Sequence, residues 1–184
     1  YGAKDFENLR KSLAHSYRLT AFIAAGVLIL SQSFASLVLT GLHTPSNIIG
    51  MSLLYLRIIF CGIPATAAYN MFASALRAMG NSKTPLTAMI IASVLNVSLD
   101  ILFVAGFGWG VAGAAIATVI AQSFSAVYCF LILRRIDIVH LTRADFMPAS
   151  GMNARLMKLG IPVVFQNIII GVGGLVVQYV INGL

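Results

Sequence analysis

Charged residues are scarce in this chain: only 9% of its 184 residues are Asp, Glu, Lys or Arg, and only five of them are acidic. A soluble domain usually carries about 25% charged residues. The chain therefore has too little polar surface to fold as a domain in water. Its hydrophobic fraction of 59% predicts a protein that crosses a membrane several times.

Cysteine and histidine are also rare, which excludes several kinds of site. Cys61 and Cys129 both lie in apolar stretches, so we expect small core residues rather than a disulfide framework or a metal site. His15, His43 and His140 fall in or near loops. No nucleophile, metal-binding spacing or phosphate-binding loop accompanies them, so we expect neither an enzyme nor a cofactor.

Five apolar stretches approach or exceed the roughly 20 residues that a helix needs to cross a bilayer. They cover residues 19–40, 48–76, 85–107, 111–133 and 156–184. The sequence therefore predicts an all-α integral membrane protein, built as a multi-span helical bundle. Pro64 lies inside the second stretch and predicts a bend there, because proline removes one backbone hydrogen bond of a helix. Such a bend is a candidate hinge.

Lys and Arg gather in alternate loops. Four of them precede the first stretch, two lie between the second and third, and five lie around residues 134–158. By the positive-inside rule, these loops are cytoplasmic and the uncharged loops are external. The same pattern accounts for the net charge of +7. It does not indicate nucleic-acid binding, which needs basic residues clustered with stacking aromatics on a polar surface.

Asp100 is the only acidic residue inside an apolar stretch. A carboxylate at the centre of a membrane helix costs roughly 2.5–3.5 kcal/mol on insertion scales, and such residues often mark ion or proton pathways. Asn96 precedes it by four residues, so a helix places both on one face. Asp100 lies seven residues before the end of the stretch 85–107, and Thr118 lies seven residues after the start of the stretch 111–133. At about 1.5 Å per residue, both are expected about 10 Å below the external boundary.

The oxygens of Asp100, Asn96 and Thr118 would form a hard-oxygen cluster, which suits Na⁺ or a proton rather than a soft metal. The alternative is a polar contact that only fixes helix packing. Arg57 is the one basic residue inside a stretch. It extends its charged end toward water or pairs with a neighbouring carbonyl, or else it lines a cavity for an anionic or polar group.

Several strings resemble the multidrug and toxic compound extrusion (MATE) family. The most specific are the basic loop LRAMGNSKTP, the NxxxD pattern of NVSLD, and GVAGAAIATV at the start of the following stretch. YGAKD resembles the family's loop between its second and third helices, and LGIP resembles the start of its seventh helix. The chain then corresponds to helices three to seven of a two-lobed, twelve-helix secondary transporter. Residues 1–133 would belong to the amino-terminal lobe, 134–155 to the inter-lobe linker, and 156–184 to the first helix of the second lobe.

The resemblance implies antiport, in which inward flow of Na⁺ or H⁺ drives export of drug-like or toxic organic compounds, often organic cations. The family's cation site uses an Asn and an Asp on helix five and a Thr on helix six, which match Asn96, Asp100 and Thr118. A further Asp, on helix one, falls outside this chain. Polar positions of helix four are similar to Tyr55 and Asn70. A multi-pass protein of the cell (inner) membrane, monomeric when complete and surrounded by lipid, is expected.

Two other classes remain open. A flippase for lipid-linked saccharides or peptides, from the same superfamily, often lines its cavity with several Arg residues, whereas only Arg57 is available here. A non-transporting membrane scaffold would need no carboxylate within the membrane, so Asp100 argues against it.

Overall fold

The structure is a computed structural model of the chain. It describes residues 5–41, 46–136 and 143–146 and, beyond them, residues 154, 156–162, 164–166, 168–170 and 173. The chain divides into two compact units, Tyr1–Asp145 and Phe146–Leu184. The described part of the first unit is helical, with no strand.

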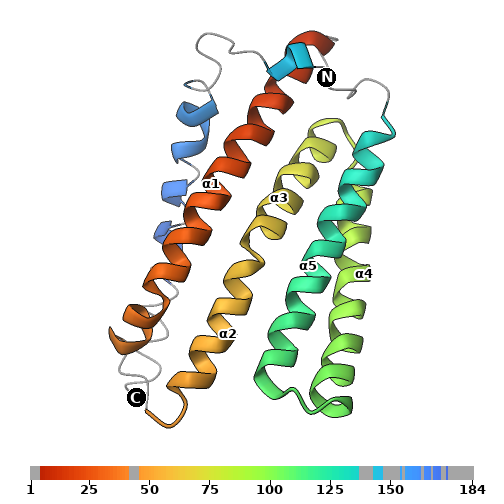
Figure 1. The fold of residues 1–184 in the computed structure, drawn as a ribbon. Helices are drawn as coiled ribbons and strands as arrows, with labels where there is room; N and C mark the ends of the chain where they lie inside the picture. Colours follow the sequence, from red (N-terminus) through yellow and green to blue (C-terminus); the bar gives the residue numbers. More distant parts are fainter. Residues whose placement is uncertain are drawn as a thin grey trace. The chain divides into compact units, whose positions relative to one another are not determined.

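Four helical spans of the first unit are long and apolar enough to cross a membrane (Figure 1). They are built from α1 (Phe6–Gly41), α2 (Ile49–Cys61) with α3 (Ile63–Ala78), α4 (Lys83–Asp100) with its continuation η1 (Ile101–Gly106), and α5 (Gly110–Arg134). The prediction of an all-α, multi-span membrane fold is confirmed. The limits of α4–η1 and α5 agree with the predicted stretches 85–107 and 111–133 to within two residues.

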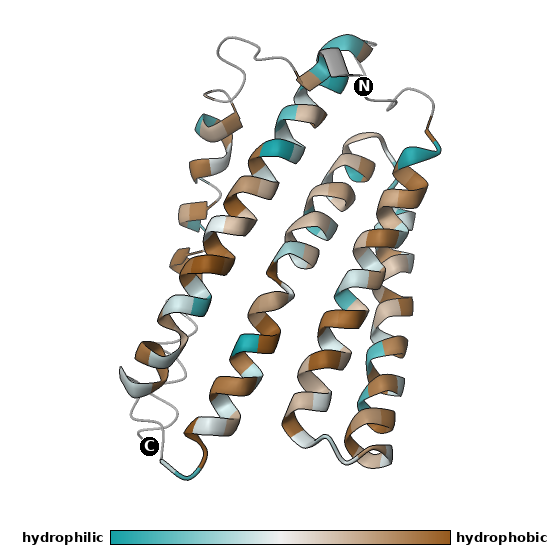
Figure 2. Cartoon of the chain, viewed as in Figure 1, coloured by the Kyte–Doolittle hydropathy of each residue, from teal (hydrophilic) through white to brown (hydrophobic). Residues whose placement is uncertain are grey.

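Helix α5 is the centre of the first unit. It packs against α2, α3 and α4, while α1 packs against α2 and α3. The start of α1, the turn between α3 and α4, and the end of α5 lie together at one end (Figure 1). Figure 2 shows hydrophilic residues at this end, in the first turns of α1 and near the end of α5. The segments that carry most of the Lys and Arg therefore share one end, as the positive-inside rule requires.

Helix α1 begins well before residue 19, where the first apolar stretch starts, because polar residues stabilise its first turns. The Asp5 carboxylate accepts a hydrogen bond from the Asn8 backbone N–H at 3.2 Å and from Asn8 Nδ2 at 2.7 Å. This arrangement satisfies one of the free N–H groups at the helix start, and the same bonds lower the pKa of the Asp5 carboxyl. One turn later, Lys11 Nζ lies 2.7 Å from Glu7 Oε1.

The bend predicted at Pro64 is confirmed as a break in the helix. α2 ends at Cys61, Gly62 separates the two helices, and Pro64 lies in the first turn of α3. Proline is tolerated there because an N–H in the first turn has no partner within its own helix. The Gly62 N–H bonds to the Ile59 carbonyl at 2.9 Å, which tightens the last turn of α2.

A π-helical segment, not predicted from the sequence, follows Asp100 directly. η1 covers Ile101–Gly106, and the Phe107 N–H donates to the Leu102 carbonyl at 2.9 Å, five residues back. The ring of Phe103, which belongs to this segment, stacks on the ring of Trp109, with centroids 5.1 Å apart. π-Helical turns are rare in proteins, and those that occur are often found at functional sites.

The two cysteines have different surroundings. Cys129 is fully buried in the hydrophobic core, as predicted. Cys61 is exposed, so its assignment to the core was wrong. It lies in the last turn of α2, where its sulfur accepts a hydrogen bond from Gln32 Nε2 of α1 at 3.3 Å.

Small residues let α5 approach η1 closely. Gly113, Ala117 and Ala121 are buried on one face of α5, as their spacing of four predicts. A Cβ at Gly113 would lie 2.9 Å from Phe103 Cβ and 3.1 Å from Trp109 Cβ. This distance is too short for the existing packing.

Gly113→Ala is therefore expected to lower the thermal unfolding temperature of the purified full-length protein in detergent, since overpacking typically costs about 1–3 kcal/mol. Gly26→Ala is a matched control, because a Cβ at Gly26 meets nothing within 4 Å. Equal unfolding temperatures for the two variants would contradict the close approach.

Much of the predicted linker and fifth stretch lies outside the described residues. Within 134–155, Arg143–Phe146 form a single 3-10 turn, and Arg10 Nε of α1 lies 3.8 Å from Asp145 Oδ1. In the second unit, the described residues between Leu156 and Ile170 are helical. Beyond Ile170, residues 171, 172 and 174–184 of the predicted stretch 156–184 are outside the described part.

Candidate functional site

Asp100 is the last residue of α4, immediately before the π-helical segment. Its side chain is half-buried. Its Oδ1 atom is fully buried and has no hydrogen-bond partner among the residues that the structure describes. A buried polar atom without a partner costs about 1–3 kcal/mol, and more when the group is charged. Asp100 therefore presents an acceptor that a proton or a cation would satisfy.

Asn96 and Thr118 meet across α4 and α5. Asn96 Nδ2 lies 3.5 Å from Thr118 Oγ1, a long and weak contact. The Thr118 hydroxyl donates to the Ala114 carbonyl of its own helix at 3.0 Å. The structure thus brings two of the three predicted site residues together.

The structure pairs Thr118 with Asn96 rather than with Asp100. Within the described residues, no hydrogen bond joins Asp100 to either of the other two. The expected depth of Asp100 assumed α-helical geometry up to Phe107, whereas residues 101–106 are π-helical. The count of 1.5 Å per residue therefore does not hold there, and the contact falls one turn away, at Asn96.

A cavity of about 340 Å³ opens beside this contact, between α3, α4 and α5. Its polar lining residues are Thr66, Tyr69, Asn70, Ser93, Asn96, Thr118, Gln122 and Ser125. Asn70 thus shares a cavity with Asn96 and Thr118. The polar lining residues are all uncharged, and the remaining lining residues are Met89, Ala92 and Ala121.

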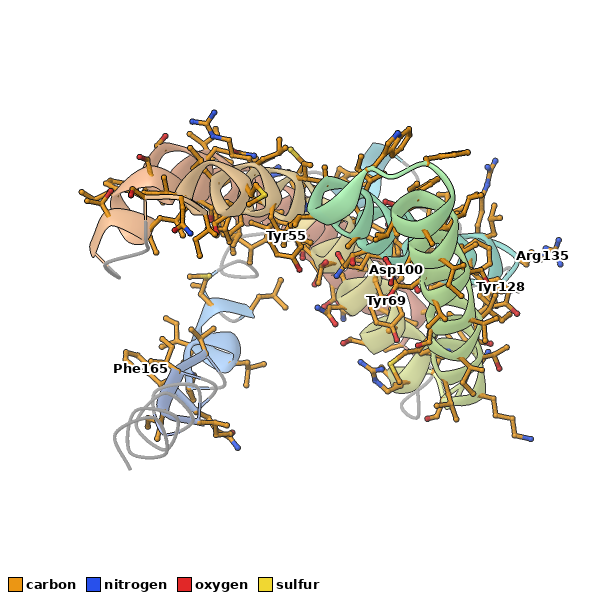
Figure 3. All side chains as sticks on the ribbon, turned by 90° about the horizontal axis from the view of Figure 1, so that it is seen from below. Tyr55, Tyr69, Asp100, Tyr128, Arg135 and Phe165 are labelled. Carbon is orange, nitrogen blue, oxygen red and sulfur yellow. The ribbon has the colours of Figure 1, made fainter. Side chains whose placement is uncertain are left out.

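The other predicted residues lie away from this cavity. Tyr55 and Arg57 are both exposed on α2 and do not line it. The Arg57 carbonyl accepts a hydrogen bond from Gln32 Nε2 at 2.9 Å. Pro64 lines a separate, apolar pocket between α1 and α3. In the view along the helices, Tyr55 lies on α2 and Asp100 on α4 (Figure 3). The Tyr69 hydroxyl donates to the Pro85 carbonyl near the start of α4 at 3.2 Å, whereas Asp100 is the last residue of that helix.

Five polar residues of the cavity were not predicted from the sequence, namely Thr66, Tyr69, Ser93, Gln122 and Ser125. Two of them bond to each other. The Thr66 hydroxyl of α3 donates to Gln122 Oε1 of α5 at 2.7 Å. Gln122 carried a usable signal, because it is the only amide residue in α5 and follows Thr118 by four residues. Thr66 carried none, since a threonine can bond its own helix anywhere in a span.

The three predicted site residues fit a hard cation or a proton in their chemistry, but only Asn96 and Thr118 are in contact. Asp100, Asn96 and Thr118 offer a carboxylate, an amide and a hydroxyl, which are oxygen ligands. Among the described residues, no group of three His, Cys, Asp or Glu side chains forms a metal site. A transition metal is therefore a poor match for this part of the chain.

Comparison with known proteins finds a family model and curated proteins that match much of the chain. The family model described as MatE matches residues 1–102. "Probable multidrug resistance protein YpnP" of Bacillus subtilis is 36% identical over 148 residues, which are 80% of this chain and 33% of that protein. "Multidrug export protein MepA" of Staphylococcus aureus is 25% identical over 180 residues, 96% of this chain and 40% of that protein. The chain thus spans well under half the length of these relatives.

Solved structures show the same fold. An inward-facing multidrug resistance MATE family transporter of the MOP superfamily matches with a TM-score of 0.81 and 24% identity, over 88% of this chain and 37% of that one. A MATE structure in a bent conformation matches with a TM-score of 0.74 and 21% identity, over 85% of this chain and 40% of that one. The chain therefore has the fold of part of these structures.

Proposed function

Because the chain belongs to the MATE family, we propose that it is part of a secondary transporter that exports drug-like or toxic organic compounds in exchange for Na⁺ or H⁺. The family match covers residues 1–102, more than half of the chain. The named relatives are multidrug resistance and export proteins. Four membrane-length helices and the likeness in fold support the same proposal.

The single observation that carries the coupling proposal is the buried, unpartnered Oδ1 of Asp100. A proton or Na⁺ bound there would neutralise a charge that is costly within a membrane. Asn96 lies on the same face of α4 as Asp100, and Thr118 of α5 contacts Asn96. Both residues can therefore complete the coordination of an ion at Asp100. A bound ion shifts the balance between two packings of the helices only by its difference in affinity for them.

The substrate class that we propose is a small organic cation. The cavity between α3, α4 and α5 has a volume of about 340 Å³, at the lower end of ligand pockets, which measure about 300–1,000 Å³. Because Asn96 and Thr118 line it, an ion and a substrate would compete for the same polar groups. We further propose a monomeric protein of the cell (inner) membrane, with helices outside this chain completing the cavity.

The placement of basic residues weighs against the flippase alternative. Among the described residues, no Lys or Arg lines the cavity. Arg57 is exposed on α2 and does not line this cavity. An anionic, lipid-linked saccharide would therefore find no cationic partner in this cavity.

The test is efflux of a fluorescent organic cation from liposomes that contain the full-length protein. Na⁺ and pH gradients are imposed independently, so that each can be present, absent or reversed. We expect the efflux rate to follow one gradient and to reverse with it. Efflux that matches that of empty liposomes, or that ignores both gradients, would refute cation-coupled export.

A further inference from the structure

The break between α2 and α3 is pressed directly against α5. Gly62, at the break, is buried. A Cβ added to it would lie 3.0 Å from the Ile59 carbonyl oxygen, 3.1 Å from Gln122 Oε1 and 3.1 Å from Val119 Cγ2. Its φ of −77° is ordinary, so the position requires glycine for space rather than for backbone conformation.

The same Gln122 holds the first turns of α3 by a hydrogen bond. The Thr66 hydroxyl lies 2.7 Å from Gln122 Oε1 and 3.2 Å from the Gly62 carbonyl oxygen. A hydroxyl has one proton, so it donates to one of these acceptors at a time. In the structure the shorter distance is to Gln122. If α5 moved away, the proton could turn to the Gly62 carbonyl, and Thr66 would remain satisfied.

Gln122 lies one helical turn after Thr118, on the same face of α5. Thr118 contacts Asn96 of α4, while Gln122 contacts Thr66 of α3. All four side chains line one cavity. Helix α5 therefore connects the candidate ion site on one side with the break between α2 and α3 on the other.

We propose that Gln122 and Thr66 are a positioning pair that transmits movement of α5 at the ion site to the break before Pro64. With the hydrogen bond made, the start of α3 is held against α5. With the Thr66 proton turned to Gly62, α3 is free to change its angle to α2. The Thr66 hydroxyl thus has an acceptor in both arrangements, and a coupling element requires two such alternative arrangements. This inference rests on the proposed function.

The experiment measures ion-driven efflux by the full-length protein in liposomes for Thr66→Val, Gln122→Met and the double variant. Both substitutions keep the side-chain volume similar and remove the hydrogen bond. Each single variant should lower the maximal efflux rate by about fivefold or more, at the lower end of typical coupling effects. The ion concentration for half-maximal rate should change less than about twofold. The double variant should be no slower than the slower single variant, because one interaction is lost in each case.

Two control variants separate this role from simple packing. Thr66→Ser keeps the hydroxyl and should restore a rate near that of the wild type. Thr87→Val removes a hydroxyl that donates to the Lys83 carbonyl of its own helix at 3.0 Å, and it should have no effect on the rate. A loss with Thr87→Val equal to that with Thr66→Val, or losses that multiply in the double variant, would overturn the pair.

The outcomes also separate this inference from the proposed function. If wild-type efflux follows an ion gradient and both single variants keep the wild-type maximal rate, the positioning pair is wrong and the transport function stands. If wild-type efflux ignores both gradients, the proposed function and the pair fail together. All rates are divided by the amount of folded protein recovered in the liposomes.

Discussion

Asp100→Asn in the full-length protein is expected to remove the dependence of efflux on the coupling ion while the protein still folds. Asn has nearly the same shape as Asp but can neither take up a proton nor carry the charge that attracts Na⁺. Coupling free energies of about 1–3 kcal/mol correspond to effects of about 5–150-fold, so a loss of gradient-driven efflux in this range is expected. The fold should survive, because the substitution removes a buried charge that is costly to keep.

The measurement compares initial efflux rates with and without the effective gradient, at equal amounts of protein. Ser98→Ala is a suitable control: Ser98 is exposed on the same helix, and its hydroxyl donates to the Val94 carbonyl at 2.8 Å. It should retain the wild-type response. Gradient-driven efflux by Asp100→Asn at the wild-type rate would show that the carboxylate has no part in coupling.

Gly62→Leu is expected to have the largest effect on folding. The position has no room for a Cβ without a shift, since the Ile59 carbonyl, Gln122 and Val119 all lie within 3.1 Å of it. Three further carbon atoms would force α2 and α5 apart at the break. Overpacking of this kind costs about 1–3 kcal/mol and occasionally more, which is a large fraction of the stability of a typical domain.

The yield of folded protein and its thermal unfolding temperature in detergent would measure this effect. Gly50→Leu makes the same chemical change in the first turn of α2, where a Cβ meets nothing within 4 Å. It should behave like the wild type. Gly62→Leu protein with the wild-type yield and unfolding temperature would mean that α5 does not pack against the break as described.

The helices were predictable because local signals define them. Long apolar stretches and alternating basic loops gave the spans and their order. Pro64 marked the break between α2 and α3. The glycines of GFGWG fit the turn after η1, because Gly108 and Gly110 adopt positive φ values of 68° and 54°, which other residues rarely adopt.

The tertiary details were not predictable, because they depend on how helices far apart in the sequence face one another. Thr66 and Gln122 are separated by 56 positions, and nothing near Thr66 indicates its partner. Asp100 and Asn96 could be chosen from composition and spacing alone. The contact of Thr118 with Asn96 instead of Asp100 depended on the backbone of residues 101–106, whose apolar side chains suit an α-helix as well as a π-helix.

The π-helical segment affects how many residues can separate Asp100 from the turn after η1. A π-helical turn closes its hydrogen bond one residue later than an α-helical turn. A homologue with one residue fewer in this segment can therefore close it as an α-helix, with Asp100 and the outer turn kept on their present faces. The outer turn is held in place, because Gly113 of α5 fits tightly against Phe103 and Trp109. A gap of one residue here in an alignment of relatives would thus mark a relative that lacks the π-helical turn, not one in which the acidic residue faces elsewhere.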